Sequence, residues 1–454
     1  MKLKTRLLIL AGCAAAFLVI TPVLVFYALG YRVDFDNREI VSTGGIYVKA
    51  VPTGAEISID ARPSERTTYF NPSVFVQNLA PGMHAVSIKK DAYISYQKTL
   101  AVEKNEVTKL EDVVLFKEKP AFTLLRENVD YFSVAPDQAT LLTAVLTKNT
   151  IEFELAGQNN GAPKTYSLAA LNGKITGATW SADSKKALLT ISTNHFLLDA
   201  SGTQLSITPL PALKLAKQIS FNPQNNAELF YIKDNNLHSM LAAAALIKNV
   251  LAYGADGNNL VVFSGDGFLY QATFAGVTNA KMTIETFTVK KNTAYKLSVV
   301  GAVVFLQQGE NTFSLDAATK TLVPFIGSAH GFTLSPDREK IAFLTSDELF
   351  YSIIAEPSAG KISLGTVTAA MSDLWWFNND YVIFKAGDRV IISEIDARGN
   401  VNVAPLPATI SLQKTGGTAM EIELEHPSIF FSERDKKVYL LTQRTLAVSE
   451  KLAP

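Results

Sequence analysis

Two patterns of hydrophobic and polar positions divide this chain of 454 residues. The first is an unbroken apolar run at 7–29, which contains no charged side chain and follows Lys2, Lys4 and Arg6. At about 1.5 Å per residue, a helix of this length spans roughly 35 Å, and the hydrocarbon core of a bilayer is about 30 Å thick. The run therefore predicts a transmembrane helix over 7–29, behind a basic segment at 1–6.

The basic residues before the helix predict its orientation. By the positive-inside bias the N-terminus stays in the cytoplasm, and because no comparable apolar run follows, the rest of the chain forms one ectodomain outside the cytoplasm. The alternative is a cleaved signal peptide, since Ala28 and Gly30 are small residues at the positions that a signal peptidase inspects. The apolar core of a signal is usually about 7 to 15 residues long, so this longer run favours a retained, single-pass anchor.

The second pattern begins after a mixed, charged segment at 30–45, which we expect to be a juxtamembrane linker. Apolar and polar residues then alternate at 55–60 and again at 85–89, and this period of two is typical of strands. Leu79-Ala80-Pro81-Gly82 has the composition of a turn, because proline presets φ and glycine tolerates a positive φ. The segment 46–116 therefore predicts a small all-β sandwich.

This segment resembles the PEGA domain, a short β module of bacterial and archaeal envelope proteins. The resemblance rests on the order and spacing of four motifs, which are Val51-Pro52-Thr53-Gly54-Ala55-Glu56-Ile57-Ser58-Ile59-Asp60, Asn71-Pro72, Leu79-Ala80-Pro81-Gly82-Met83-His84-Ala85-Val86-Ser87-Ile88 and Asp91-Ala92-Tyr93. Ala61-Arg62 and Ala92 stand where glycine is usual. The resemblance implies a non-catalytic surface or spacer module, and it implies no ligand residues.

From Asp130 onward one phrase recurs, which is an apolar strand, a turn and a second apolar strand. It is clearest at 332–343, where Ser335-Pro336-Asp337 forms the turn. Proline presets φ there, and serine and aspartate side chains bond free N–H groups, so we interpret these aspartates as turn residues and not as catalytic ones. The eight turn markers are Asp137, Asp183, Gln224, Asp256, Gly301, Asp337, Asp380 and Pro427.

The markers recur about every 40 residues, which is the period of a four-stranded propeller blade. The phrase resembles the repeat of TolB-type and WD-repeat-like propellers, which implies a binding platform on the top face and central channel. We therefore expect an all-β protein in which a linker at 117–129 joins the sandwich to a β-propeller of seven or eight blades at 130–454. Within it, the alanine-rich stretch 240–247 favours a short inserted helix or a strand end.

The composition argues against several classes of function. Lys and Arg number 42, as do Asp and Glu, so the formal net charge is zero and no net field attracts nucleic acid. The only cysteine, Cys13, lies in the predicted membrane helix. The predicted ectodomain therefore has no disulfide, no thiolate nucleophile and no cysteine metal site.

The sequence contains no motif of a known catalytic or metal site. The five histidines lie far apart, and there is no His-Glu-x-x-His, Gly-x-Ser-x-Gly or phosphate-loop motif. The oxygen-rich segments 256–259 and 265–267 lack the spacing of a calcium loop, so turn chemistry is the favoured interpretation. We expect no catalytic residues, no cofactor and no bound metal.

The densest aromatic cluster is Trp375-Trp376-Phe377. Tryptophan packs in cores, stacks on sugar faces and anchors interfaces, and alternation along a strand points neighbouring tryptophans in opposite directions. Core packing is the favoured interpretation, and a binding face is the alternative for Trp375 and Trp376. We expect a binding or scaffold protein of the cell envelope, with a protein, peptide or glycan as partner. The alternative is a propeller-bearing hydrolase or hydrolase accessory subunit, which requires clustered His, Asp and Glu side chains.

Overall fold

A computed structural model describes residues 3–28, 31–34, 39–60, 62, 65–157, 162–169, 173–354, 362–366, 369–413 and 419–453. The chain divides into two compact units. The first unit comprises Met1–Lys119, Asp396–Ala404 and Leu452–Pro454, and the second comprises Pro120–Ile395 and Pro405–Lys451. The backbone therefore returns to the first unit twice after it has entered the second.

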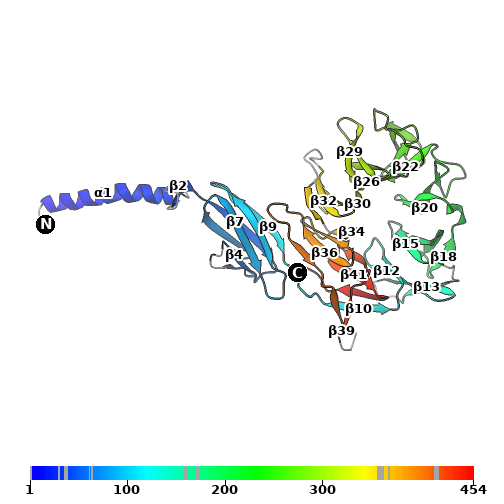
Figure 1. The fold of residues 1–454 in the computed structure, drawn as a ribbon, viewed down its shortest axis with the longest axis horizontal. Coiled ribbons are helices and arrows are strands. Elements are labelled where there is room, and N and C mark those ends of the chain that lie inside the picture. Colours follow the sequence, from blue (N-terminus) through cyan, green and yellow to red (C-terminus); the bar gives the residue numbers. More distant parts are fainter. Residues whose placement is uncertain are drawn as a thin grey trace. The chain divides into compact units, whose positions relative to one another are not determined.

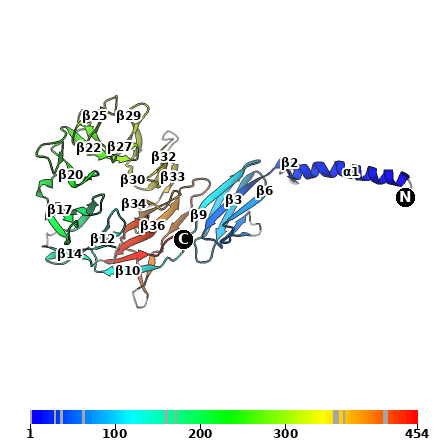
Figure 2. The ribbon, with the colours of Figure 1, turned by 180° about the vertical axis from the view of Figure 1, so that it is seen from behind.

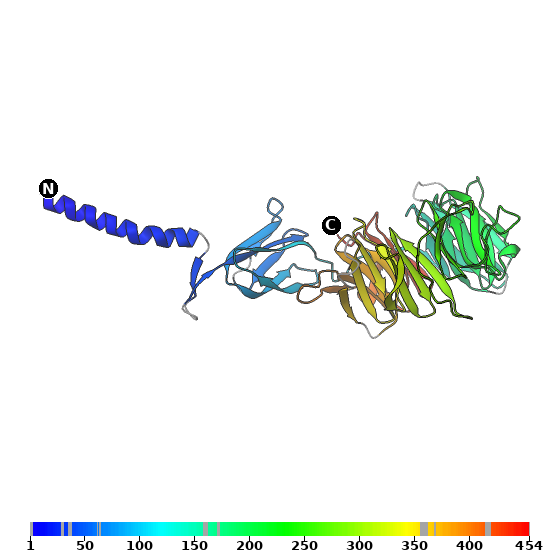
Figure 3. The same cartoon turned by 90° about the horizontal axis from the view of Figure 1, so that it is seen from above.

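Helix α1 (Leu3–Ala28) is one continuous coil, drawn in blue in Figure 3. Its stretch Ile9–Tyr27 has a mean hydropathy of 2.5 and is not buried, and no other helix among the described residues is long and apolar enough to cross a membrane. The helix includes residues 7–28 of the predicted apolar run, and Leu29 lies outside the described residues. Signal sequences share these properties, so retention of the anchor stays a prediction.

In the part of the first unit that the structure describes, the strands form a hairpin and two sheets. In the hairpin β1 (Tyr31–Asp34) pairs with β2 (Glu39–Ser42), within the segment that we expected to be a linker. One sheet has the order β6-β3-β9, and these strands lie side by side in Figure 2: β3 (Gly44–Val51), β6 (Ser73–Leu79) and β9 (Val107–Val114). The other sheet has the order β5-β4-β7-β8: β4 (Glu56–Ile59), β5 (Glu65–Arg66), β7 (Gly82–Lys89) and β8 (Tyr96–Val102).

These two sheets enclose one hydrophobic core. Buried and exposed positions alternate strictly along β8. Ile46 and Val48 of β3 and Ile57 and Ile59 of β4 belong to the same buried cluster, although they come from different sheets. The alternation at 46–116 therefore corresponds to a two-sheet sandwich, in which each strand turns one face inward.

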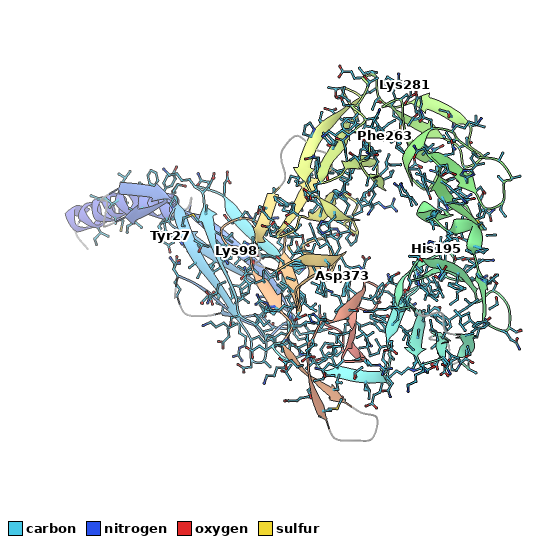
Figure 4. All side chains as sticks on the ribbon, turned by 45° about the vertical axis from the view of Figure 1, so that its right-hand side comes forward. Tyr27, Lys98, His195, Phe263, Lys281 and Asp373 are labelled. Carbon is cyan, nitrogen blue, oxygen red and sulfur yellow. The ribbon has the colours of Figure 1, made fainter. Side chains whose placement is uncertain are left out.

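A distant segment of the chain, Asp396–Ala404, belongs to this unit and packs around Lys98 of β8, which Figure 4 labels. The Lys98 side chain is fully buried. Its Nζ donates hydrogen bonds to the carbonyl oxygens of Asp396 (2.8 Å) and Asn400 (2.9 Å), and the Asp396 carboxylate lies 3.7 Å away. Burial of an ammonium group without such partners would destabilise the fold. The segment 396–404 therefore provides the hydrogen-bond acceptors and the negative charge that the buried Lys98 ammonium group needs.

The same segment lies close against the backbone of β8. Asn400 Nδ2 donates to the carbonyl oxygen of Gln97 (2.7 Å), and the Gln97 N–H donates to Asn402 Oδ1 (3.2 Å). Gly399 has a φ of 65°, and a Cβ at this position would lie 2.3 Å from the carbonyl oxygen of Thr99. Only glycine therefore fits this approach.

The second unit contains eight sheets among the described residues, which we number 1 to 8. Sheet 1 contains β11 (Tyr131–Val134), β12 (Thr140–Leu146), β13 (Thr150–Gly157) and β14 (Lys164–Ala169). Sheet 2 contains β15 (Ile175–Trp180), β16 (Lys186–Ile191), β17 (Asn194–Asp199) and β18 (Ser206–Pro209). Sheet 3 contains β19 (Lys217–Asn222), β20 (Asn225–Lys233) and β21 (Asn236–Ser239), and the 3-10 helix η1 (Pro211–Leu213) precedes it.

The next four sheets have four strands each. Sheet 4 contains β22 (Val250–Ala255), β23 (Leu260–Ser264), β24 (Leu269–Ala272) and β25 (Thr278–Lys281). Sheet 5 contains β26 (Tyr295–Val300), β27 (Val303–Gln308), β28 (Asn311–Asp316) and β29 (Thr321–Gly327). Sheet 6 contains β30 (His330–Leu334), β31 (Lys340–Leu344), β32 (Glu348–Ile353) and β33 (Ile362–Thr366). Sheet 7 contains β34 (Met371–Trp376), β35 (Tyr381–Ala386), β36 (Arg389–Glu394) and β37 (Val403–Pro405).

Sheet 8 joins the two ends of the second unit and corrects one prediction. Its order is β39-β38-β10-β42-β41-β40, from β10 (Phe122–Glu127), β38 (Thr409–Gln413), β39 (Met420–Glu423), β40 (Ser428–Ser432), β41 (Lys437–Thr442) and β42 (Thr445–Ser449). The segment 117–129 is therefore not only a linker. It contains β10, whose Phe122 is fully buried and whose cyan ribbon lies among the red strands in Figure 1. Local sequence patterns did not predict this strand because β42, with which it pairs, lies at the other end of the chain.

The sheets follow one another around a ring (Figure 1), and each packs on the next. Buried clusters join sheets 1 and 2, 2 and 3, 3 and 4, 4 and 5, and 5 and 6. Trp376 of sheet 7 donates to the Thr333 carbonyl oxygen of sheet 6 (3.0 Å), and Trp375 contacts Phe430 of sheet 8. A further cluster joins sheet 8 to sheet 1, so the ring is closed. The second unit is a β-propeller.

The predicted turn markers coincide with one feature of the sheets. The markers at 137, 183, 224, 256, 301, 337 and 380 all lie between the first and second strands of sheets 1 to 7. The marker Pro427 is wrong, because it precedes β40, and the corresponding turn of sheet 8 is 433–436. This turn has no Ser-Pro-Asp motif, which is why the sequence pattern missed it.

The stretch 240–247 forms neither the expected helix nor a regular strand. It follows β21 in turns, and Ile247 makes a single bridge to Leu237. Sheet 3 has three strands, and this segment stands where the other sheets place a fourth. Contacts with Leu237 therefore outweigh the helix propensity of the alanines.

Candidate binding pocket

A cavity of about 440 Å³ opens where the first strands of sheets 7, 8, 1 and 2 meet. Four aromatic residues line it: Trp180 of β15, Trp375 of β34, and Phe430 and Phe431 of β40. Glu433 is the one charged residue among the described residues that line it. We call this cavity the Trp375 pocket.

The two tryptophans singled out in the sequence have different environments. Trp376 is fully buried, and its Nε1 donates to the carbonyl oxygen of Thr333. Trp375 is half-buried, lines the pocket and contacts Phe430 edge to face, with 6.1 Å between ring centroids. Alternation along β34 thus gives one tryptophan to the core and the other to the pocket.

The indole N–H of Trp375 differs from those of the other two tryptophans. Trp180 Nε1 donates to Ser133 Oγ (2.9 Å), which holds its ring against the neighbouring sheet. No described residue accepts a hydrogen bond from Trp375 Nε1, whereas both Trp180 and Trp376 have acceptors. The pocket therefore contains a hydrogen-bond donor that is available to a ligand or to water.

Glu433 is positioned by a contact between sheets 8 and 1. Gln138 Oε1 accepts hydrogen bonds from Ser432 Oγ (3.0 Å) and from the backbone N–H of Arg434 (2.8 Å). These residues flank Glu433 in the chain, so Gln138 fixes the turn that carries the carboxylate. Gln138 is a positioning residue that sequence analysis missed, because its partners lie almost 300 residues away.

The carboxylate of Glu433 lies in surroundings that disfavour its charge. Although the residue as a whole is exposed, partial burial raises the pKa of Glu433, and the charge of Lys436 lowers it only in part. Lys436 Nζ donates to the Phe377 carbonyl oxygen and lies over the Phe377 and Phe431 rings, 5.4 and 5.8 Å from their centroids. Burial lowers the pKa of Lys436 below its usual value, and the charge of Glu433 offsets this effect only in part.

The aspartates of the repeated turns have a structural role. Asp183 Oδ1 accepts from Ser181 Oγ (2.7 Å) and the Lys185 N–H (3.2 Å), and Asp337 makes the same contacts with Ser335 and the Glu339 N–H. In each turn burial raises the pKa of the aspartate, but these hydrogen bonds outweigh burial and hold it below 3.8. The aspartates therefore cap the turns, as their sequence motif predicts.

The oxygen-rich segments are also turns. Asp256 Oδ1 accepts from the N–H groups of Asn258 (2.8 Å) and Asn259 (2.6 Å), and Asp266 accepts from the N–H of Phe268 (3.2 Å). Within the described ranges, no group of three or more His, Cys, Asp or Glu side chains is arranged to hold a metal ion.

Comparison with known proteins identifies the sandwich of the first unit. Residues 43–115 match the PEGA domain. No curated protein matches the chain. Ala92 of the PEGA domain, which replaces the usual glycine, has a φ of 65°, so the position does require the conformation that glycine adopts most easily. Ala61, the other departure, lies outside the described residues.

Several solved structures are similar to the propeller part of the chain. The C-terminal WD40 domain of Sif2 has a TM-score of 0.47 at 11% identity, with 73% of this chain and 99% of that chain covered. BamB from Moraxella catarrhalis has a TM-score of 0.45 at 12% identity, with 73% and 98% covered. The computationally designed protein Ika8 has a TM-score of 0.46 at 12% identity, with 74% and 99% covered. These likenesses concern the fold alone, which here follows from the eight sheets and their packing.

Proposed function

We propose that this protein is a membrane-anchored scaffold of the cell envelope, whose propeller binds a segment of another envelope protein in the Trp375 pocket. The observation that carries the proposal is the half-buried indole of Trp375, which faces a cavity with its N–H unpaired among the described residues. Tryptophan in a partly desolvated cavity is a typical anchor of protein interfaces. Helix α1 and the PEGA domain support the envelope location, since a membrane helix and a spacer module suit an exported binding protein.

We further propose that the protein is not an enzyme. The described lining of the pocket contains one carboxylate and neither histidine nor lysine, so it lacks a pair of groups for general acid and base catalysis. Its aromatic walls suit binding by contact area. The purified protein should therefore show no hydrolysis of peptide, ester or glycoside substrates, with or without added zinc or calcium. A metal-dependent turnover that survives purification would overturn this part.

The binding function is tested by capture of partners from detergent-solubilised envelopes with the full-length protein. Trp375→Ala should lose the captured protein while its melting temperature stays near that of the wild type. Phe268→Ala is a matched control, because Phe268 is also a half-buried aromatic residue but does not line the pocket. Equal capture by all three proteins would contradict a binding role for the pocket.

The location is tested separately. Full-length protein should sediment with membranes, resist extraction by carbonate and expose only its ectodomain to external protease. Recovery of a soluble mature form that begins at Tyr31 would show that α1 is a cleaved signal peptide.

A further inference from the structure

The charge of the Trp375 pocket indicates the kind of side chain that it accepts. Glu433 provides the only charge among its described lining residues, and it lines the same cavity as four aromatic residues, Trp180, Trp375, Phe430 and Phe431. Aromatic faces carry a negative quadrupole, so rings and carboxylate attract the same sign of charge. The pocket is therefore complementary to a cation.

The carboxylate is free to act on a ligand. Glu433 has no hydrogen-bond donor among the described residues, and Gln138 holds the residues on either side of it. Lys436, whose charge lowers the pKa of Glu433, has its ammonium group engaged by the Phe377 carbonyl oxygen and does not line the pocket. The carboxylate is thus both preorganised and incompletely neutralised.

We infer that the Trp375 pocket binds an arginine side chain presented by the partner polypeptide. A guanidinium group stacks on indole rings and donates two parallel hydrogen bonds to a carboxylate, which a lysine ammonium does not do. The cavity volume of about 440 Å³ leaves room for the aliphatic stem and a flanking residue as well. Trp375 Nε1 is then available to a backbone carbonyl of the same segment. This inference rests on the proposed binding function and names the chemistry of its ligand.

The test compares two pentapeptides, Gly-Gly-Arg-Gly-Gly and its citrulline counterpart, which has the same shape but no charge. Binding to the full-length protein in detergent micelles is followed by the change in tryptophan fluorescence. The arginine peptide should bind at least about 10-fold more tightly than the citrulline peptide, since a charged hydrogen-bonded pair is replaced by a neutral one. Equal affinities would overturn the inference.

Two variants locate the effect. Glu433→Gln should weaken binding of the arginine peptide about 10-fold and leave the citrulline peptide unchanged. Glu339→Gln is the matched control, because Glu339 is an exposed glutamate in the corresponding turn of sheet 6 and does not line the pocket. An equal loss in both variants would show a general effect of protein charge and would contradict the pocket assignment.

The pH dependence gives a second readout. The field around the pocket is set by the charges of Glu433, Asp137, Arg434, Lys436 and Lys451. Because the pKa of Glu433 is raised above 4.5, affinity for the arginine peptide should begin to fall at a higher pH than for an ordinary glutamate. Glu433→Gln should abolish this acid-side loss, and retention of the loss in that variant would contradict the inference.

Failure of this inference can be separated from failure of the proposed function. If Trp375→Ala abolishes partner capture but Glu433→Gln does not, the pocket binds a partner that it does not recognise through arginine. Tight binding of a chitin or cellulose oligosaccharide, lost in Trp375→Ala, would replace the arginine inference with a glycan site. If no variant changes capture, the proposed function itself falls.

Discussion

The PEGA domain and the propeller are both built of strands, but they bury their apolar residues in different ways. In the PEGA domain two sheets face each other, and one cluster contains nearly all the buried hydrophobic side chains of residues 46–115. In the propeller the clusters lie between successive sheets, and each cluster takes residues from both neighbours. A PEGA sheet therefore buries its apolar residues against one other sheet. Every propeller sheet needs two neighbouring sheets to bury its apolar residues, so the ring must close.

The two regions also differ in their buried polar groups. The PEGA domain encloses one ammonium group, that of Lys98, which relies on a distant segment of the chain. The propeller links the turns of neighbouring sheets through many separate contacts, such as the bond from the Asp137 N–H to Ser184 Oγ (2.9 Å) and the bond from Lys340 Nζ to the Asn379 carbonyl oxygen (3.2 Å). We therefore expect that loss of the Lys98 ammonium group alone strongly destabilises the PEGA domain. In the propeller we expect a strong loss of stability when one sheet is removed.

Removal of the closing strands should have the largest effect. A chain truncated after Pro427 lacks β40 to β42, so β10 keeps β38 but loses β42, and sheets 1 and 7 lose their contacts with β40 to β42. The exposed strand edges should cause loss of the cooperative propeller transition and association of the protein. Calorimetry and sedimentation of the full-length and truncated proteins in detergent measure this. A monomeric truncated protein with an unchanged transition would refute ring closure as the source of stability.

The next largest effect should come from Trp376→Ala. Truncation of this fully buried side chain leaves a cavity and removes the hydrogen bond from Nε1 to the Thr333 carbonyl oxygen, so we expect a loss of about 3–5 kcal/mol in the free energy of unfolding. Trp375→Ala should cost about 1 kcal/mol or less, because Trp375 is half-buried. Urea unfolding of both variants tests the assignment of one tryptophan to the core and the other to the pocket. Similar losses would show that the assignment is wrong.

Lys98→Met should be nearly as damaging to the PEGA domain. Methionine replaces the aliphatic stem, but the carbonyl oxygens of Asp396 and Asn400 lose their donor, so we expect a loss of about 2–4 kcal/mol. Lys109→Met is the control, because the Lys109 side chain is 64% exposed and its loss should change stability by less than about 0.5 kcal/mol. Equal stability of the two variants would mean that the segment 396–404 contributes little.

The smallest effect concerns Asp60 of the PEGA domain, which bonds the His84 ring and accepts from the Ala85 N–H (2.9 Å). Burial raises the pKa of Asp60, but these hydrogen bonds outweigh it and hold the pKa below 3.8. A lowered pKa stabilises the fold above the unfolded value, and this contribution disappears as the pH falls through the folded value. Asp60→Asn should therefore cost about 1 kcal/mol near neutral pH and flatten the loss of stability below pH 3.8. Unfolding measured between pH 2 and pH 7 checks this, and identical pH profiles would contradict it.

Most of the local structure could be predicted because its causes are local. The apolar run predicts α1, alternation predicts the PEGA strands, and the turn motif marks the first turn of sheets 1 to 7. Where the motif is absent, as at 433–436, the prediction placed the marker on Pro427 instead. The candidate site was predictable only in part. Trp375 stood out as an aromatic residue, but nothing near it in the sequence distinguished it from Trp376.

The sequence by itself determined the N-terminal apolar helix, the strand-rich class and the turn chemistry, because side-chain period, apolar length and turn residues act over a few positions. Only the tertiary structure decided that β10 completes sheet 8, that 396–404 surrounds Lys98 and that Trp180, Trp375 and Glu433 share one pocket. Gln138 and Ser432, which fix that pocket, are 294 positions apart. Contacts between residues so far apart in sequence form only when the ring closes, so local sequence patterns do not predict them.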